Sequence, residues 1–216
     1  MTPPPVSSRD LFWSGLGSWR DAKRSAEQSG WSLIGTGDWA WVYGSPDDRL
    51  AWRITPFDPA YDYFSGVCQK NPNPHLPHII GRRHYPNGGS AVLMERLDEV
   101  SEGVATKWVA TFDQQPDATT AAMLQILTTA VEECALPLFM GLDTNAGNVR
   151  RQAPDGPLVL IDAFWINGRA LFDMVVTEPQ QAVDLFGLRE LRNWTHIPAI
   201  DPAGAARAVK ALNETR

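Results

Sequence analysis

The alternation of apolar and polar residues predicts helices near both ends of the chain. Over residues 10–29, apolar side chains recur at roughly helical spacing, and Gly30 is a plausible helix stop. Further on, Thr177-Glu178-Pro179-Gln180 has the pattern of a capping box and predicts a helix to about residue 194. Asp201, followed by proline, predicts a last helix to about residue 213.

Two more helices are predicted in the middle of the chain. Residues 56–71 carry apolar side chains at helical spacing, and the run Asn71-Pro72-Asn73-Pro74 then breaks the pattern. Asp117 could cap a second helix, whose apolar stripe runs from Ala121 to Cys134 at spacings of three and four.

Short runs bounded by turn residues predict strands between these helices. The first set covers residues 31–34, 35–43 and 49–55, with a turn at 45–48. A buried strand is expected over 90–97, and a hairpin over 149–161, whose second strand is the apolar run before Asp162. Helices and antiparallel strands in this order predict an α+β fold.

Three polar residues around this hairpin point to phosphoryl-transfer chemistry. Asn148 follows Asp143 by five residues, and Asp162 follows Asn148 by fourteen, at the end of the apolar strand. An acceptor hydroxyl needs a carboxylate to take its proton, and Mg²⁺ on nucleotide phosphates needs hard oxygen ligands. Asp and Asn are also ordinary turn residues, so a purely structural loop is the competing interpretation.

The order Asp143, Asn148, Asp162 resembles the catalytic loop and the D-F-G motif of the protein-kinase-like superfamily. The resemblance implies a two-lobed fold, with a small antiparallel N-lobe and a reduced, mainly helical C-lobe. It also implies ATP and Mg²⁺ as cofactors. On this basis Asp143 would be the catalytic base, and Asn148 and Asp162 would be the metal ligands.

A glycine-containing hairpin supplies the second half of the resemblance. Gly35, Gly37 and Val42 fall at the offsets of the kinase glycine-rich loop, and residues 50–53 resemble the strand written V-A-I-K. A G-x-G hairpin is also a common β-turn, but four such elements in kinase order favour the kinase interpretation. The nucleotide-binding residues implied are Gly35, Thr36, Gly37, Val42, Ala51, Arg53, Met94, Glu95 and Leu97. Of these, Met94 would lie beside the adenine, and the backbone of Glu95 to Leu97 would contact its edge. Asp62 is the expected acidic partner of Arg53, and Asp58 is expected to cap a helix.

The chain departs from the kinase pattern at several positions. Arg53 stands where kinases have lysine, Ala40 replaces the third loop glycine, and Phe164 replaces the glycine of D-F-G. No A-P-E motif follows Asp162, after which only 54 of the 216 residues remain. Gly147, directly before Asn148, resembles the small-molecule and atypical branches more than ordinary Ser/Thr kinases; these branches include aminoglycoside phosphotransferases and minimal bacterial or phage kinases. The expected divisions are an extension over 1–30, partly helical, an N-lobe over 31–97 and a C-lobe over 98–216.

Composition narrows the expected partners and location. A formal charge of −6 and a pI near 5.2 argue against nucleic acid or an anionic membrane as partner. Two cysteines, far apart in sequence, favour a reducing compartment, and no apolar run approaches membrane-spanning length. The expectation is a cytoplasmic protein.

These patterns lead to one main functional hypothesis and two alternatives. The main hypothesis is an ATP- and Mg-dependent phosphotransferase that acts on a hydroxyl of a protein or small molecule, which would make the protein an enzyme. The first alternative is a pseudokinase that acts as a binding module for a protein partner. The second is a kinase-like fold that transfers AMP. The sequence leaves the acceptor and the oligomeric state undefined.

Overall fold

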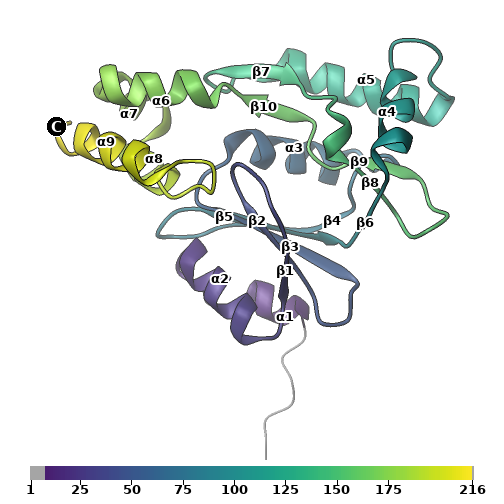
Figure 1. Cartoon of the computed structure of the whole chain (residues 1–216), viewed down its shortest axis with the longest axis horizontal. Coiled ribbons are helices and arrows are strands. Elements are labelled where there is room, and N and C mark those ends of the chain that lie inside the picture. Colours follow the sequence, from purple (N-terminus) through teal and green to yellow (C-terminus); the bar gives the residue numbers. More distant parts are fainter. Residues whose placement is uncertain (1–7, 216) are drawn as a thin grey trace, which may run out of the picture. The chain divides into compact units, whose positions relative to one another are not determined.

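The computed structural model describes residues 8–215 and shows an α+β fold (Figure 1). Within the described residues the helices are α1 (Ser8–Trp13), α2 (Trp19–Gln28), α3 (Pro59–Lys70), α4 (Glu102–Ala110), α5 (Ala118–Glu133), α6 (Gly168–Thr177), α7 (Pro179–Phe186), α8 (Leu188–Trp194), α9 (Pro202–Asn213) and the 3-10 turn η1 (Ala146–Asn148). The strands are β1 (Ser32–Thr36), β2 (Trp41–Gly44), β3 (Leu50–Thr55), β4 (Ile79–His84), β5 (Ser90–Glu95), β6 (Asp98–Glu99), β7 (Phe139–Leu142), β8 (Val149–Arg151), β9 (Leu158–Leu160) and β10 (Phe164–Ile166).

The chain divides into two compact units. Unit 1 comprises Met1–Asp58, Gly81–Met94 and Met174–Arg216, and unit 2 comprises Pro59–Ile80 and Glu95–Asp173. Both the predicted N-terminal extension and the last helices therefore group with unit 1, so these units cut across the predicted boundaries at residues 30 and 97. Residues 1–7 of that extension lie outside the described part of the chain.

A five-stranded sheet in the order β1-β2-β3-β5-β4 forms the centre of unit 1. The turn at 45–48 and the strand over 49–55 are confirmed, but the run 35–43 is divided: β1 extends to Thr36, residues 37–40 form the tip, and β2 begins at Trp41. Strands β1, β2 and β3 pair antiparallel. Because β5 lies between β3 and β4, it is not an edge strand. The first two residues of β4 and the last residue of β5 belong to unit 2.

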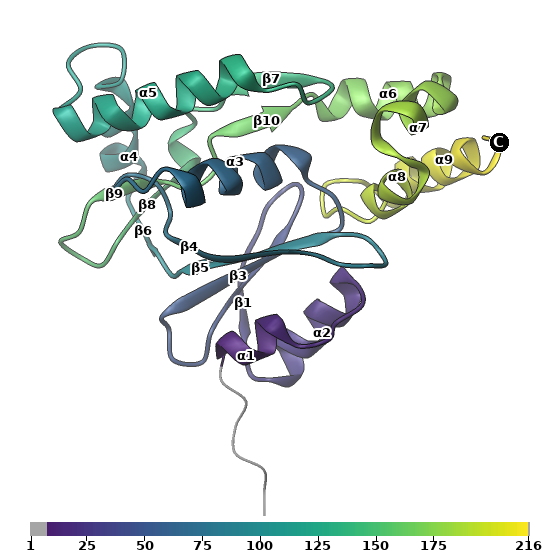
Figure 2. The same cartoon turned by 180° about the vertical axis from the view of Figure 1, so that it is seen from behind.

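The β2–β3 register places large aromatic side chains on one face of the sheet. Trp41 lies opposite Ile54 and Tyr43 lies opposite Trp52, so these four side chains share a face. The N-terminal helices cover this face (Figure 2). The ring of Phe12 in α1 packs on Trp52, and Tyr43 Oη donates a hydrogen bond to a carboxylate of α2. Burial of these rings fixes the register of the hairpin, since a one-residue slip would expose them.

The C-terminal helices differ from the prediction in one respect. The predicted helix over 177–194 is two helices, α7 and α8, because Gly187 breaks it with a φ of +85°. Glu178 occupies the N-cap position of α7 without a side-chain capping bond, so the predicted capping box is wrong. The last helix is confirmed, with the Asp201 side chain accepting from Gly204 N. Helices α4 and α6 were not predicted.

Unit 2 is mainly helical, with two small sheets, β10-β7 and β6-β8-β9. The helix expected after Asp117 is confirmed as α5, and the Asp117 carboxylate accepts from Thr119 N and Thr120 N. The hairpin expected over 149–161 is confirmed as β8 and β9. Its turn requires glycine at position 156, because a Cβ there would lie 1.6 Å from a backbone oxygen. The fully buried side chains of this unit include Phe64, Met123, Leu127 and Leu160.

None of the helices in the described residues is long and apolar enough to cross a membrane.

Candidate functional site

Two backbone hydrogen bonds in unit 2 hold Asp162 beside the loop that carries Asp143 and Asn148. Asp143 N donates to Ala163 O at 2.7 Å, and Ile161 N donates to Asn148 O at 2.8 Å. The residues on both sides of Asp162 are thus bonded to the other two predicted site residues. The β8–β9 hairpin makes these bonds possible, because it folds back the thirteen residues that lie between Asn148 and Asp162. The structure therefore brings together Asp143, Asn148 and Asp162.

The side chains of the loop are ordered by short-range hydrogen bonds. Asp143 Oδ1 accepts from Asn145 N at 2.9 Å, and Asp143 Oδ2 accepts from Asn148 Nδ2 at 3.0 Å. Gly147 N donates to Asn145 Oδ1 at 2.8 Å, which closes the turn at η1. Both a purely structural loop and a catalytic loop would make these hydrogen bonds. A carboxylate accepts about four hydrogen bonds, so Asp143 retains capacity for a hydroxyl.

The donor set in this loop suits a cation that is shared with a ligand. Among the described residues, no group of three or more His, Cys, Asp and Glu could hold a metal ion. Asn148 and Asp162 together offer amide and carboxylate oxygens, and the hydrogen bond from Asn148 Nδ2 leaves its Oδ1 as the available ligand atom. Mg²⁺ in proteins is commonly held by one or two such groups plus substrate phosphates and water. The residues present fit that mode of binding.

Four of the predicted nucleotide-binding residues of unit 1 lie on the sheet face opposite the aromatic one. Thr36 is not among them, because it pairs with Trp41 and therefore lies on the aromatic face. Val42 on β2 pairs with Arg53 on β3, and on the other side it pairs with Gly35 on β1. Ala51 is two residues from Arg53 and therefore points to the same side. The strand register thus brings four predicted residues, which are up to eighteen positions apart in sequence, to one face of strands β1, β2 and β3: Gly35, Val42, Ala51 and Arg53.

Arg53 forms a buried ion pair with Asp58. The guanidinium Nη2 lies 2.6 Å from Asp58 Oδ2, and the two side chains are only 10% and 7% exposed. Sequence reasoning made Asp58 a helix cap and missed this pairing, because it depends on how the chain turns after β3. A buried charge pair of this kind is strongly coupled, since removal of one partner leaves the other charge in a low-dielectric environment.

The tip of the glycine-rich hairpin, residues 37–40, is a tight turn. Gly37 N donates to Ala40 O at 3.0 Å, and Thr55 Oγ1 donates to Trp39 O at 2.6 Å. A Cβ on Gly37 would meet no atom within 4 Å, and neither Gly35 nor Gly37 is among the glycines with positive φ. Packing and backbone conformation therefore do not demand glycine at position 37.

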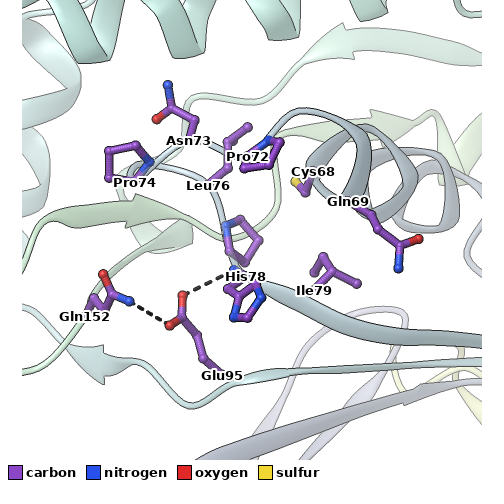
Figure 3. A pocket seen from close by; sticks show the side chains of 11 residues that line it. Cys68, Gln69, Pro72, Asn73, Pro74, Leu76, His78, Ile79, Glu95 and Gln152 are labelled. Carbon is purple, nitrogen blue, oxygen red and sulfur yellow. Dashed lines mark hydrogen bonds between the residues drawn. The ribbon is translucent and has the colours of Figure 1, made fainter.

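The predicted adenine-contacting residues lie at the end of β5. Met94 is buried, whereas Glu95 and Leu97 are half-buried. The Glu95 side chain takes part in a separate feature of unit 2, a pocket of about 390 Å³ lined mainly by Pro72, Pro74, Leu76 and Ile79 (Figure 3). Its Oε2 accepts from Gln152 Nε2 at 2.8 Å and its Oε1 accepts from His78 N at 3.2 Å. Glu95 N donates to His78 O, so only the carbonyl of Glu95 is left for the predicted backbone role.

Comparisons with known proteins give matches among solved structures only. No protein-family model and no curated protein sequence matches the chain. A double mutant of the PknI kinase domain from Mycobacterium tuberculosis is 19% identical, with a TM-score of 0.36, and the alignment covers 86% of this chain and 95% of that one. The kinase PK-1 from Cydia pomonella granulovirus is 15% identical, with a TM-score of 0.38, and covers 68% of this chain and 59% of that one.

Proposed function

We propose that the protein is an ATP- and Mg-dependent phosphotransferase that acts on a hydroxyl group. The observation that carries the proposal is the pair of backbone hydrogen bonds that flank Asp162 and join it to Asp143 and Asn148. These bonds assemble, within one unit, a carboxylate for an acceptor proton and two hard oxygen donors for a cation. Phosphoryl transfer depends mainly on such positioning and charge neutralisation.

The roles divide between the two units. In unit 2, Asp143 orients the acceptor hydroxyl and takes its proton as the oxygen forms a bond to the γ-phosphorus and ADP leaves. Asn148 and Asp162 hold the cation, which neutralises phosphate charge when bound. In unit 1, Arg53 grips phosphate and Val42 packs on the adenine. The hairpin that carries Gly35, Thr36 and Gly37 lies against the phosphates; since Gly37 N donates to Ala40 O, the phosphate donors are other backbone N–H groups of this hairpin. The absence of a structural need for glycine at position 37 supports this role.

The decisive experiment is transfer of a γ-labelled phosphate from ATP with Mg²⁺, by the purified protein alone and with a cell lysate. Label on the protein or on a lysate component, lost in Asp162→Asn, is the expected result. Asp155→Asn is the matched control, because Asp155 is an exposed carboxylate in the same hairpin. Equal labelling by the wild type and Asp162→Asn would remove the metal assignment.

Two outcomes would favour the alternatives. A rise in melting temperature with Mg·ATP, but no transfer in any mixture, would indicate a pseudokinase that binds a protein partner. Label from α-labelled ATP, with an AMP mass on the product, would indicate AMP transfer by the same residues. A cytoplasmic location is part of the main proposal, and it suits the thiol state of Cys68 and Cys134.

A further inference from the structure

The tip of the glycine-rich hairpin is bonded to a segment from the other end of the chain. Ala199 N donates to Asp38 O at 2.9 Å. Ala199 follows α8, and both residues belong to unit 1. The loop after α8 lies beside the hairpin in both views of the fold (Figures 1 and 2). We call residues 187–200 the α8 segment.

The α8 segment is itself anchored to the sheet through Trp19. The indole Nε1 of Trp19 donates to Asn193 Oδ1 at 2.9 Å in a buried hydrogen bond, and the Trp19 ring stacks on Trp41 at 5.5 Å with an interplanar angle of 11°. The ring of His196 lies 5.9 Å from Trp19. Because Trp41 directly follows the tip and pairs with Thr36, the segment is coupled to the hairpin both at the tip and at the first strand pair beside it.

Aromatic rings supply a further connection from α7. Phe186, the last residue of α7, packs edge-on against Phe57 at 5.8 Å, and Phe57 packs on Trp39 at the hairpin tip. Helices α7, α8 and α9 also pack on one another. The contacts to the tip therefore come from an assembled helical element and not from an isolated terminal residue.

Because the peptide group is planar, a hydrogen bond that holds a carbonyl also fixes the direction of the next backbone N–H group. In a trans peptide the C=O of one residue and the N–H of the next point in opposite directions. The carbonyl of Asp38 is held by Ala199, and that of Trp39 is held by Thr55 Oγ1. The N–H groups of Trp39 and Ala40 are thereby turned away from the groups that hold the carbonyls. Backbone N–H groups fixed in this way form anion-binding sites.

We propose that the α8 segment is a positioning element for nucleotide phosphates. By holding the carbonyl of Asp38, Ala199 fixes the peptide plane whose N–H would face a phosphate. The segment acts through the hairpin and does not itself touch the nucleotide. This inference rests on the proposed function for its ligand, but the restraint on the tip is a property of unit 1 alone.

The test compares Ala199→Pro with Ala199→Ser in the full-length chain. Proline removes the N–H that donates to Asp38, whereas serine keeps it, and the Ala199 side chain is exposed. Amide exchange of residues 36–41 is followed by mass spectrometry, with β3 as the internal reference. Mg·ATP affinity is measured on the same samples. The expected result for proline is faster exchange at the tip and weaker affinity, each by about two- to tenfold, the factor that one net hydrogen bond supplies. Serine should change neither.

Trp19→Phe provides a second variant if Ala199→Pro fails to fold. It removes the donor to Asn193 and retains an aromatic ring over Trp41, so exchange at the tip should again rise. Unchanged exchange at residues 36–41 in both variants would overturn the proposal. Faster exchange with unchanged affinity would overturn the phosphate-positioning role. If the wild type binds no nucleotide, the proposed function and this role both fail, while the exchange data still show whether the segment holds the tip.

Discussion

The buried pair of Arg53 and Asp58 makes a quantitative prediction about stability. Asp58→Ala removes a carboxylate that lies 2.6 Å from the guanidinium in a site where both side chains are about nine-tenths buried. Breaking such a pair costs about 3–5 kcal/mol, because the guanidinium loses its close carboxylate in a site that water reaches poorly. For a chain of this size, about 2–4 °C of melting temperature is lost per kcal/mol, so the expected fall is about 6–20 °C.

An exposed pair in the same hairpin is the natural control. Arg49 Nε lies 3.0 Å from Asp47 Oδ2, but these side chains are 81% and 44% exposed. Arg49→Met should therefore cost no more than about 1 kcal/mol. Melting is followed by circular dichroism and by scanning fluorimetry on the same preparations. A fall for Asp58→Ala that is no larger than that for Arg49→Met would refute the energetic reasoning.

The double variant Arg53→Met/Asp58→Leu separates stability from function. An apolar pair of similar volume often replaces a buried ion pair at little cost, so the double variant should regain at least half of the lost melting temperature. Nucleotide affinity should nevertheless remain low, since the phosphate-binding cation is gone. Recovery of both properties together would show that Arg53 does not bind phosphate.

Three further predictions concern other parts of the fold. Partial burial lowers the pKa of His196, so the unfolded chain binds more protons than the folded chain just below pH 6.5. Stability should therefore fall modestly as the pH drops through that range. In a pH series of melting curves, His196→Gln should make this fall smaller. Gly156→Ala should destabilise the hairpin before Asp162 and lower the labelling activity. The control is Gly103→Ala in α4, where a Cβ meets nothing within 4 Å, and it should leave stability and labelling unchanged. Asp117→Ala should lower the urea concentration at the midpoint of unfolding through loss of the α5 cap, and an unchanged midpoint would contradict that role.

The α8 segment also bears on how the departures from the kinase pattern are interpreted. The sequence has Ala40 where the pattern has a third loop glycine, and the structure buries Ala40 in the tip that Ala199 and Thr55 hold. A tip whose carbonyls are held by hydrogen bonds from Ala199 and Thr55 needs less backbone freedom than a mobile tip. The substitution is therefore compatible with a fixed hairpin.

Local sequence patterns determined most of the secondary structure. Asp117 and Asp201 cap helices as predicted because their side chains reach backbone N–H groups within three residues. The hairpins follow from apolar runs separated by turn residues, which is again local information. The glycine at position 187 was a local signal too, and overlooking it produced one long predicted helix in place of α7 and α8.

Only the tertiary structure decided which distant residues meet. The sequence selected Asp143, Asn148 and Asp162 by their order, but the backbone bonds through Ile161 and Ala163 depend on how the β8–β9 hairpin folds back. The contact between Ala199 and Asp38 joins residues 161 positions apart, and no periodicity or motif encodes it. Short-range patterns report on bonds within a turn or a helix, whereas long-range pairings result from burying Trp19 and its apolar neighbours in one core.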